Sequence, residues 1–246
     1  MLITTETVDI PVDGSPMRCF LARPKAEGRY PAVVFYSDIF QLTGPMLRIS
    51  RRLAGYGFAV LSPEIYHRIE PPGTVLDFDA DRARALDDSG KVPVAQFDAD
   101  IAAALAYLAG RPDVDGGRLL AAGFCFGGHL AFRAALRPEV KATACFYGTG
   151  IHNGKLGCDR ADSLERAGEI GGKLLMVFGT LDPHIPEDGR RTIDEALKSS
   201  GVDYQIQTYP AEHTFMRDEG ARHDPEATDQ AFGAMIGLFR GVCGTS

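Results

Sequence analysis

The stretch AAGFCFGGHLAF, residues 121–132, sets a single cysteine among glycines, with apolar residues on both sides. Cys125 lies two residues after Gly123 and two before Gly127, and Gly128 follows directly. A buried structural cysteine does not need such neighbours, but a turn so tight that a Cβ would collide does. The letters before Cys125 are typical of a strand and those after it of a helix. The stretch therefore predicts a sharp strand-to-helix turn with the cysteine at its tip.

Gly-x-Cys-x-Gly in that setting is the pattern of a nucleophile elbow with cysteine in the serine position. The following helix would direct its positive end at the sulfur and favour the thiolate. The backbone N–H of Phe126 would face the place where an oxyanion forms. The alternatives are a buried structural cysteine and a nucleotide-binding loop. The glycines do not give G-x-G-x-x-G and no lysine makes a P-loop, which disfavours the second alternative.

Eight apolar, β-rich runs recur along the chain, and several are nearly continuous, as in strands covered on both faces. They are TVDIPV, MRCFLA, AVVFYS, FAVLSP, RLLAAGF, KATACFY, KLLMVFG and DYQIQTY. Segments with helical spacing lie between most of them, and the last helix is expected to begin with Asp224 as N-cap and Pro225 after it. The first two runs are separated only by the turn signal VDGSP, which predicts an antiparallel hairpin at the sheet edge.

Strands that alternate with helices predict an α/β fold with a mostly parallel, twisted sheet of about eight strands and helices on both faces. The chain has 246 residues, and we expect one domain over 1–246. In such sheets ligands bind beyond the carboxyl ends of the strands. The chemistry should therefore lie in the loops that follow the strands.

Composition excludes several classes of protein. The charge is 26 − 33 = −7 without long runs of one sign, which disfavours nucleic acid or an anionic membrane as the main partner. The sequence has no run of eighteen apolar residues, so we expect no transmembrane helix, and its first residues do not read as a signal peptide. The cysteines form a poor disulfide framework and a poor zinc site, which predicts reduced thiols in a cytoplasm and no metal or organic cofactor. They are Cys19, Cys125, Cys145, Cys158 and Cys243.

A cysteine nucleophile needs a base, and the base needs an acid to orient it. On this kind of sheet the chain order is nucleophile, acid, histidine. Asp182 follows the run KLLMVFG, and His213 follows DYQIQTYP by a few residues. Both fall at the expected carboxyl edge, so the three side chains could converge. The alternative for Asp182 is an Asp-Pro turn residue.

Other histidines compete with His213 for the role of base. His184 is only two residues from Asp182, and one loop is not expected to supply both acid and base. His152 precedes any acid loop, and His223 lies close to the last helix. The remaining two, His67 and His129, have ordinary explanations as a loop and a helix residue.

The loop after the third run, SDIFQLTG, supplies two further candidates. The backbone N–H of Ile39 is our candidate for completing the oxyanion hole. Asp38 beside a thiol would discourage the thiolate by like-charge repulsion unless it is neutralised or accepts a proton. Its alternative role is that of a turn or N-cap aspartate.

These segments resemble the dienelactone hydrolase family, a branch of the α/β-hydrolase fold. GFCFGGHLAF resembles its cysteine elbow, SDIFQLTG the stretch after its third strand, and EHTFMR its His-[Ser/Thr]-Phe-x-Arg segment. GYGFAVLSPEIYHR and PPGTVLD extend the resemblance over nearly the whole chain. It implies a catalytic triad of Cys125, Asp182 and His213.

The resemblance also implies that Asp38 stands where the family has a glutamate linked to activation of the thiol. Two arginines hold the substrate carboxylate in dienelactone hydrolase. Arg217 matches one of them, and Arg84 best matches the other, with Arg82 as its alternative. Without such a role, Arg82 and Arg84 would lie on a solvated helix face.

We therefore expect hydrolysis of a small enol-lactone or activated carboxylic ester through a thioester on Cys125. One alternative is a broader carboxylesterase or thioesterase whose substrate lacks a carboxylate. Another is an inactive relative that binds a small molecule or a partner. The ordered set of cysteine, aspartate and histidine disfavours the last, since a binding protein does not need all three.

Overall fold

The computed structural model describes residues 1–244. Eight strands form one sheet in the order β1-β2-β4-β3-β5-β6-β9-β10, and all eight predicted runs lie on them. The strands are β1 (Ile3–Val12), β2 (Ser15–Pro24), β3 (Tyr30–Tyr36), β4 (Ala59–Pro63), β5 (Val114–Phe124), β6 (Val140–Phe146), β9 (Lys173–Gly179) and β10 (Tyr204–Tyr209). A separate small hairpin pairs β7 (Lys155–Leu156) with β8 (Asp159–Arg160).

The sheet is antiparallel only at the edge that carries the first hairpin. β1 pairs with β2 from Ile3 opposite Pro24 to Val12 opposite Ser15, and β2 is also antiparallel to β4. All the other neighbouring strands are parallel. The expected edge hairpin and the mostly parallel sheet are thus confirmed.

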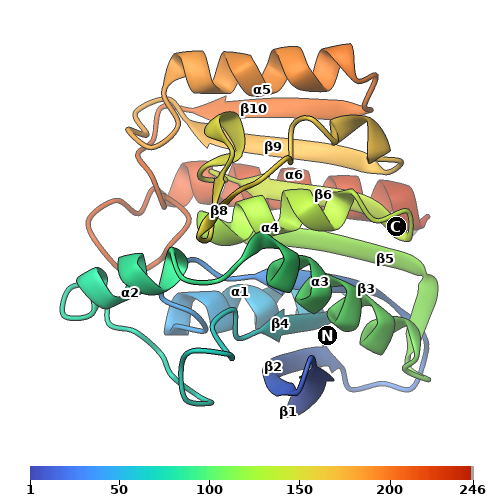
Figure 1. Cartoon of the computed structure of the whole chain (residues 1–246). Coiled ribbons are helices and arrows are strands. Elements are labelled where there is room, and N and C mark those ends of the chain that lie inside the picture. Colours follow the sequence, from blue (N-terminus) through green and yellow to red (C-terminus); the bar gives the residue numbers. More distant parts are fainter. Residues whose placement is uncertain (245–246) are drawn as a thin grey trace.

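Helices cover both faces of this sheet. In Figure 1, α3 and α4 lie in front of the central strands and α6 lies behind them. The Phe58 ring packs on Phe239 of α6 with centroids 5.9 Å apart, so the segment after α1 lies on the α6 side. The helices are α1 (Gly44–Gly55), α2 (Arg82–Ser89), α3 (Val94–Ala109), α4 (Phe126–Ala135), α5 (Glu187–Ser199) and α6 (Pro225–Cys243), with short 3₁₀ turns η1 (Ile151–Asn153) and η2 (Ala167–Glu169).

The local signals for the last helix act as expected. Asp224 caps α6 by accepting a hydrogen bond from the Ala227 N–H at 2.9 Å, and Pro225 takes the first helical position. Proline suits this position because its missing N–H would have no partner within the helix.

The core lies on both faces of the central strands, where β3 and β9 are buried along nearly their whole length. Such strands cannot place polar groups along their sides without cost. The polar side chains that could act on a ligand therefore gather in the loops after the strand ends.

No single helix within residues 1–244 is both long and apolar enough to cross a membrane, although α2 and α3, bent by 91°, pass that test as a pair by length and composition. Among these residues, no group of three or more His, Cys, Asp and Glu side chains is placed to hold a metal ion.

Candidate active site

Cys125 stands at the tip of a strained turn between β5 and α4. Its backbone has φ 56° and ψ −119°, a region that residues other than glycine rarely adopt. A Cβ on Gly123 would lie 2.0 Å from the Gly127 carbonyl oxygen, and one on Gly127 would lie 2.2 Å from the Ser37 carbonyl oxygen. The glycines are therefore required by close backbone packing, and the predicted sharp turn is confirmed.

Three side chains from separate loops form one hydrogen-bonded line. His213, after β10, places Nδ1 2.6 Å from Asp182 Oδ2, and Asp182 follows β9. The other ring nitrogen, Nε2, lies 3.2 Å from Cys125 Sγ. Cys125, Asp182 and His213 are 8%, 3% and 4% exposed, so little solvent competes for these contacts.

Electrostatics in this line favour a protonated imidazole. Burial by itself would lower the pKa of His213, but the negative charge of Cys125 and the hydrogen bonds to Asp182 and Cys125 outweigh it, so the pKa is raised. A carboxylate on one nitrogen and a sulfur on the other stabilise positive charge on the ring between them.

A second histidine, which the spacing argument set aside, lies against the first. The ring centroids of His184 and His213 are 4.6 Å apart with the rings edge to face. The His184 backbone N–H donates to Asp182 Oδ1 at 2.8 Å. The segment around His184 therefore orients Asp182, while its ring borders the His213 ring.

His129 has the ordinary role expected of it. It is fully buried, and its ring bonds to the Thr149 carbonyl oxygen at 3.0 Å and to Ser163 Oγ at 2.8 Å. Burial lowers the pKa of His129 to about 3, so the ring is neutral and holds the loop after β6.

The loop after β3 places Asp38 and Ile39 at the same edge. Asp38 is 2% exposed, and its Oδ1 accepts a hydrogen bond from the Phe40 N–H at 3.0 Å. The Ile39 N–H has no hydrogen-bond partner within residues 1–244. Phe126 is the first residue of α4, so its N–H has no partner within the helix. Both backbone donors are thus available to a ligand.

Burial raises the pKa of Asp38 to about 6, although the Phe40 N–H and the charges of Arg217 and His213 act in the opposite direction. The folded protein therefore binds this proton more tightly than the unfolded chain. The contribution of Asp38 to the free energy of unfolding should fall as the pH rises from about 4 to about 6, by about 3 kcal/mol.

Urea denaturation of the wild type and Asp38→Asn at about pH 4.5 and about pH 7.5 measures this contribution. The variant should gain stability relative to the wild type at the higher pH. An equal difference at both pH values would show that Asp38 does not titrate in this range.

These residues line a cavity of about 650 Å³. Its lining comes from the loops after β3, β5, β6, β9 and β10 and from α2 with the segment before it: Asp38, Ile39, Phe40, Phe78, Asp79, Arg82, Leu86, Ser89, Cys125, Phe126, Thr149, His184, His213, Thr214, Arg217, Gly220, Ala221 and Arg222. The Arg217 guanidinium lies over the Phe78 ring, 3.8 Å from its centroid. A cation held on an aromatic face remains free to bind an anion.

The structure does not bring Arg84 to this cavity, and it places the alternative, Arg82, in the lining. Arg84 instead forms an ion pair with Glu70. Residues two positions apart on a helix point in nearly opposite directions, so α2 can present only one of them. Arg82, Leu86 and Ser89 share the face toward the cavity, as their spacing of four and three residues allows.

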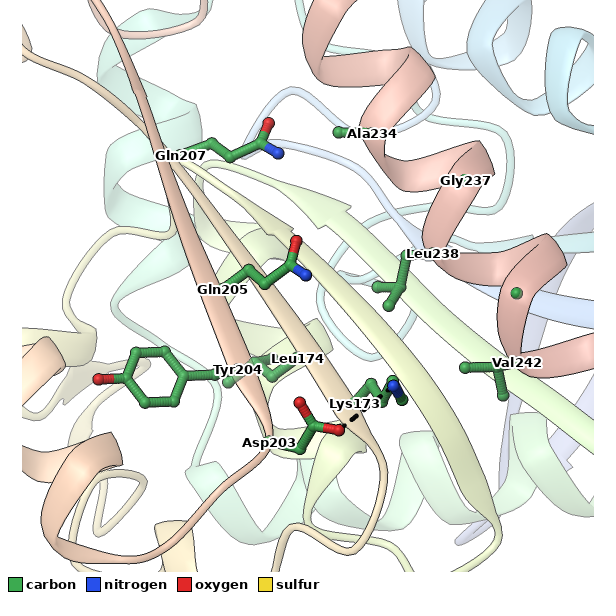
Figure 2. Close-up of a pocket in the computed structure, with 11 residues that line it drawn as sticks. Lys173, Leu174, Asp203, Tyr204, Gln205, Gln207, Ala234, Gly237, Leu238 and Val242 are labelled. Atoms are coloured by element: carbon green, nitrogen blue, oxygen red, sulfur yellow. Dashed lines mark ion pairs between the residues drawn. The ribbon is translucent and has the colours of Figure 1, made fainter.

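A second hollow, of about 400 Å³, lies between β10 and α6 (Figure 2). Gln205 and Gln207 of β10 extend toward Ala234 and Leu238 of α6, and Lys173 pairs with Asp203 at 3.3 Å. Its lining contains no cysteine, serine or histidine. This second hollow therefore offers no nucleophile–base pair like the one in the cavity at Cys125.

The order of the strands, the cysteine turn between β5 and α4, and the gathering of polar loops at one edge of the sheet together define an α/β-hydrolase fold. An esterase of Pyrobaculum calidifontis shares that fold with a TM-score of 0.71 at 21% identity, over 98% of this chain and 86% of the other. A crystal structure titled "Putative Dienelactone Hydrolase", from Klebsiella pneumoniae, has a TM-score of 0.86 at 30% identity, over 97% of this chain and 99% of the other.

The model of the Dienelactone hydrolase family matches residues 17–243. A Saccharomyces cerevisiae protein named "Putative carboxymethylenebutenolidase" is 35% identical over 97% of this chain and 92% of its own length. The chain belongs to the dienelactone hydrolase family, and it is a hydrolase of the α/β-hydrolase fold. Such a hydrolase acts on a small-molecule substrate.

Proposed function

We propose that the protein hydrolyses an enol-lactone or an activated carboxylic ester through a thioester on Cys125. The observation that carries this proposal is the line from Cys125 Sγ through the His213 ring to Asp182, with contacts of 3.2 and 2.6 Å. That arrangement supplies a nucleophile, a base and a group that orients the base.

In the first half of the reaction, the Cys125 sulfur attacks the carbonyl carbon and the carbonyl π electrons move to oxygen. The N–H groups of Ile39 and Phe126 hold the resulting oxyanion, and the loss of one such donor costs about 10²–10³ in rate. When the oxyanion collapses, the carbon–oxygen bond to the leaving group breaks. The enolate or alkoxide takes its proton from protonated His213, and an acyl thioester remains.

In the second half, neutral His213 removes a proton from a water molecule, whose oxygen attacks the thioester carbon. Collapse of this second adduct breaks the carbon–sulfur bond. The carboxylic acid leaves and gives its proton to solvent, and the Cys125 thiolate beside protonated His213 is restored. General acid–base help of this kind contributes about 10²–10⁴ in rate. Asp182 orients the ring and stabilises its charge throughout.

The choice of ester over amide follows from leaving-group chemistry. From an adduct with a poor leaving group, the thiolate departs more readily than an amine and the reaction reverses. A lactone enolate or an activated alkoxide leaves readily, which suits a sulfur nucleophile. Arg217 supports a substrate carboxylate, because its guanidinium borders the cavity and has no carboxylate partner within residues 1–244.

Rapid acid quench during turnover of a p-nitrophenyl ester tests the thioester. Intact mass should show one added acyl group, and peptide mapping should place it on the peptide that contains Cys125. An adduct on another residue, or turnover with no detectable adduct and no initial burst of p-nitrophenol, would contradict the covalent route.

A further inference from the structure

We propose that Arg82 and Arg222 form a second anion subsite at the mouth of the Cys125 cavity, and that the ester carries two carboxylates. This inference rests on the proposed function, because it assigns the substrate class of that same site. Arg217 would take one carboxylate near the reacting carbonyl, and the pair at the mouth would take the other.

The first observation is that both guanidinium groups at the mouth are uncommitted. Arg82 reaches the cavity from α2 and Arg222 from the loop before α6. Neither has a carboxylate within ion-pair distance in the part of the chain that the structure describes. Arg84, by contrast, is already paired with Glu70. Arg82 and Arg222 are therefore free to pair with a carboxylate of a bound substrate.

The acidic residues beside these arginines are turned to other partners. Asp218 and Glu219, on the loop that carries Arg222, each lie 2.6 Å from the Arg48 guanidinium. Asp77 and Asp81, just before Arg82, accept hydrogen bonds from backbone N–H groups of their own loop. These four carboxylates are thus held by other partners and do not belong to the cavity lining, in which Asp79 is the carboxylate close to Arg82.

Position separates this subsite from Arg217. Arg217 is half-buried and lies on the Phe78 ring, whereas Arg82 and Arg222 are exposed. The pKa of His184 is lowered most by burial and next by the charge of His213. The charges of Arg222 and Arg82 lower this pKa further. Arg82, Arg222 and the His184 ring line the same cavity, and both guanidinium groups are close enough to the ring to act on its charge.

The charged residues that line the cavity differ in balance from those of the whole chain. Three arginines line it against Asp38 and Asp79, whereas the chain carries a net charge of −7. At long range such an acidic protein repels anions, so the positive charge at the cavity mouth can attract them only locally. A carboxylate matches the planar fork of a guanidinium, which makes a dicarboxylate ester the best complement. Asp79 opposes that binding.

The p-nitrophenyl monoesters of pentanoic, glutaric and tricarballylic acid test this inference, because they share one chain length and carry no, one and two free carboxylates. With the uncatalysed rate subtracted, wild-type kcat/KM should be about tenfold higher for the dianion than for the monoanion. Arg222→Gln and Arg82→Gln should each lower kcat/KM for the dianion about fivefold, mainly through KM, and change that for the neutral ester by less than about twofold.

Two further variants control for simple loss of charge. Asp79→Asn should shift the preference toward the dianion, in the opposite direction to Arg222→Gln. Lys198→Gln, at the C-terminal end of α5, should leave all three rates unchanged. Equal rates for monoanion and dianion in the wild type, or equal losses on all three esters in Arg222→Gln, would overturn the subsite.

Calorimetric binding of free tricarballylate and glutarate separates this inference from the proposed function. The wild type should bind tricarballylate more tightly than Arg222→Gln does, whether or not any ester is hydrolysed. Absence of ester turnover with this binding difference intact would contradict the proposed function alone. Ester turnover that depends on Cys125, with no binding difference, would contradict the subsite alone.

Discussion

Cys125→Ala is expected to lower kcat/KM for an activated ester by about 10⁴-fold or more. The substitution removes the sulfur that lies 3.2 Å from His213 Nε2 and that we propose as the nucleophile. The oxyanion donors and the cavity remain, so KM for an ester that is still turned over should change little. Steady-state rates with a p-nitrophenyl ester give this comparison.

Cys158→Ala is the matched control, because it also removes one free thiol from the described chain but at an exposed position. It should retain wild-type activity and titrate with one thiol fewer. Activity of Cys125→Ala near the wild-type level would remove Cys125 from the reaction. The remaining catalysis would then have to come from a different nucleophile or from water.

The architecture could be predicted from sequence because its signals are local and repeated. Buried parallel strands appear as nearly continuous apolar runs, and β3 (Tyr30–Tyr36) and β9 (Lys173–Gly179) are buried in this way. The elbow was visible for a related reason. Three glycines around one cysteine indicate close backbone packing, and a Cβ on Gly127 would indeed lie 2.2 Å from the Ser37 carbonyl oxygen.

Convergence of Cys125, Asp182 and His213 could be anticipated because topology brings strand ends together. Each residue follows a strand at the same edge, and β5 and β9 are separated in the sheet only by β6. Their catalytic roles remain a proposal, which the substitution of Cys125 addresses.

Whether Arg82, His184 or Arg222 reaches the cavity depends on where a short helix or loop points, which sequence alone does not decide. Arg82 and Arg84 are two positions apart, and only the rotational phase of α2, eight residues long, decides which one reaches the cavity. His184 was set aside because it adjoins Asp182, yet adjacency along a loop lets its backbone bind Asp182 while its ring meets His213. Arg222 lies in a loop with no periodic pattern, so no spacing rule indicates its direction.

Gly127→Ala is expected to lower the free energy of unfolding by about 3 kcal/mol or more. The added Cβ would lie 2.2 Å from the Ser37 carbonyl oxygen and 2.4 Å from that of Tyr36. Both oxygens belong to backbone at the end of β3, so relief requires α4 to move away from the sheet. Such movement would also displace Cys125 from His213, and activity should fall with stability. Urea denaturation and ester turnover measure the two effects.

Gly233→Ala, in α6, makes the same chemical change where nothing lies within 4 Å of the new Cβ. Alanine is favoured over glycine within a helix, so this control should gain about 0.5–1 kcal/mol in stability. The two substitutions should therefore act in opposite directions, although each replaces a helical glycine by alanine. If Gly127→Ala were as stable as Gly233→Ala, the elbow would not need its close contact with β3, and the backbone strain at Cys125 would require a different support.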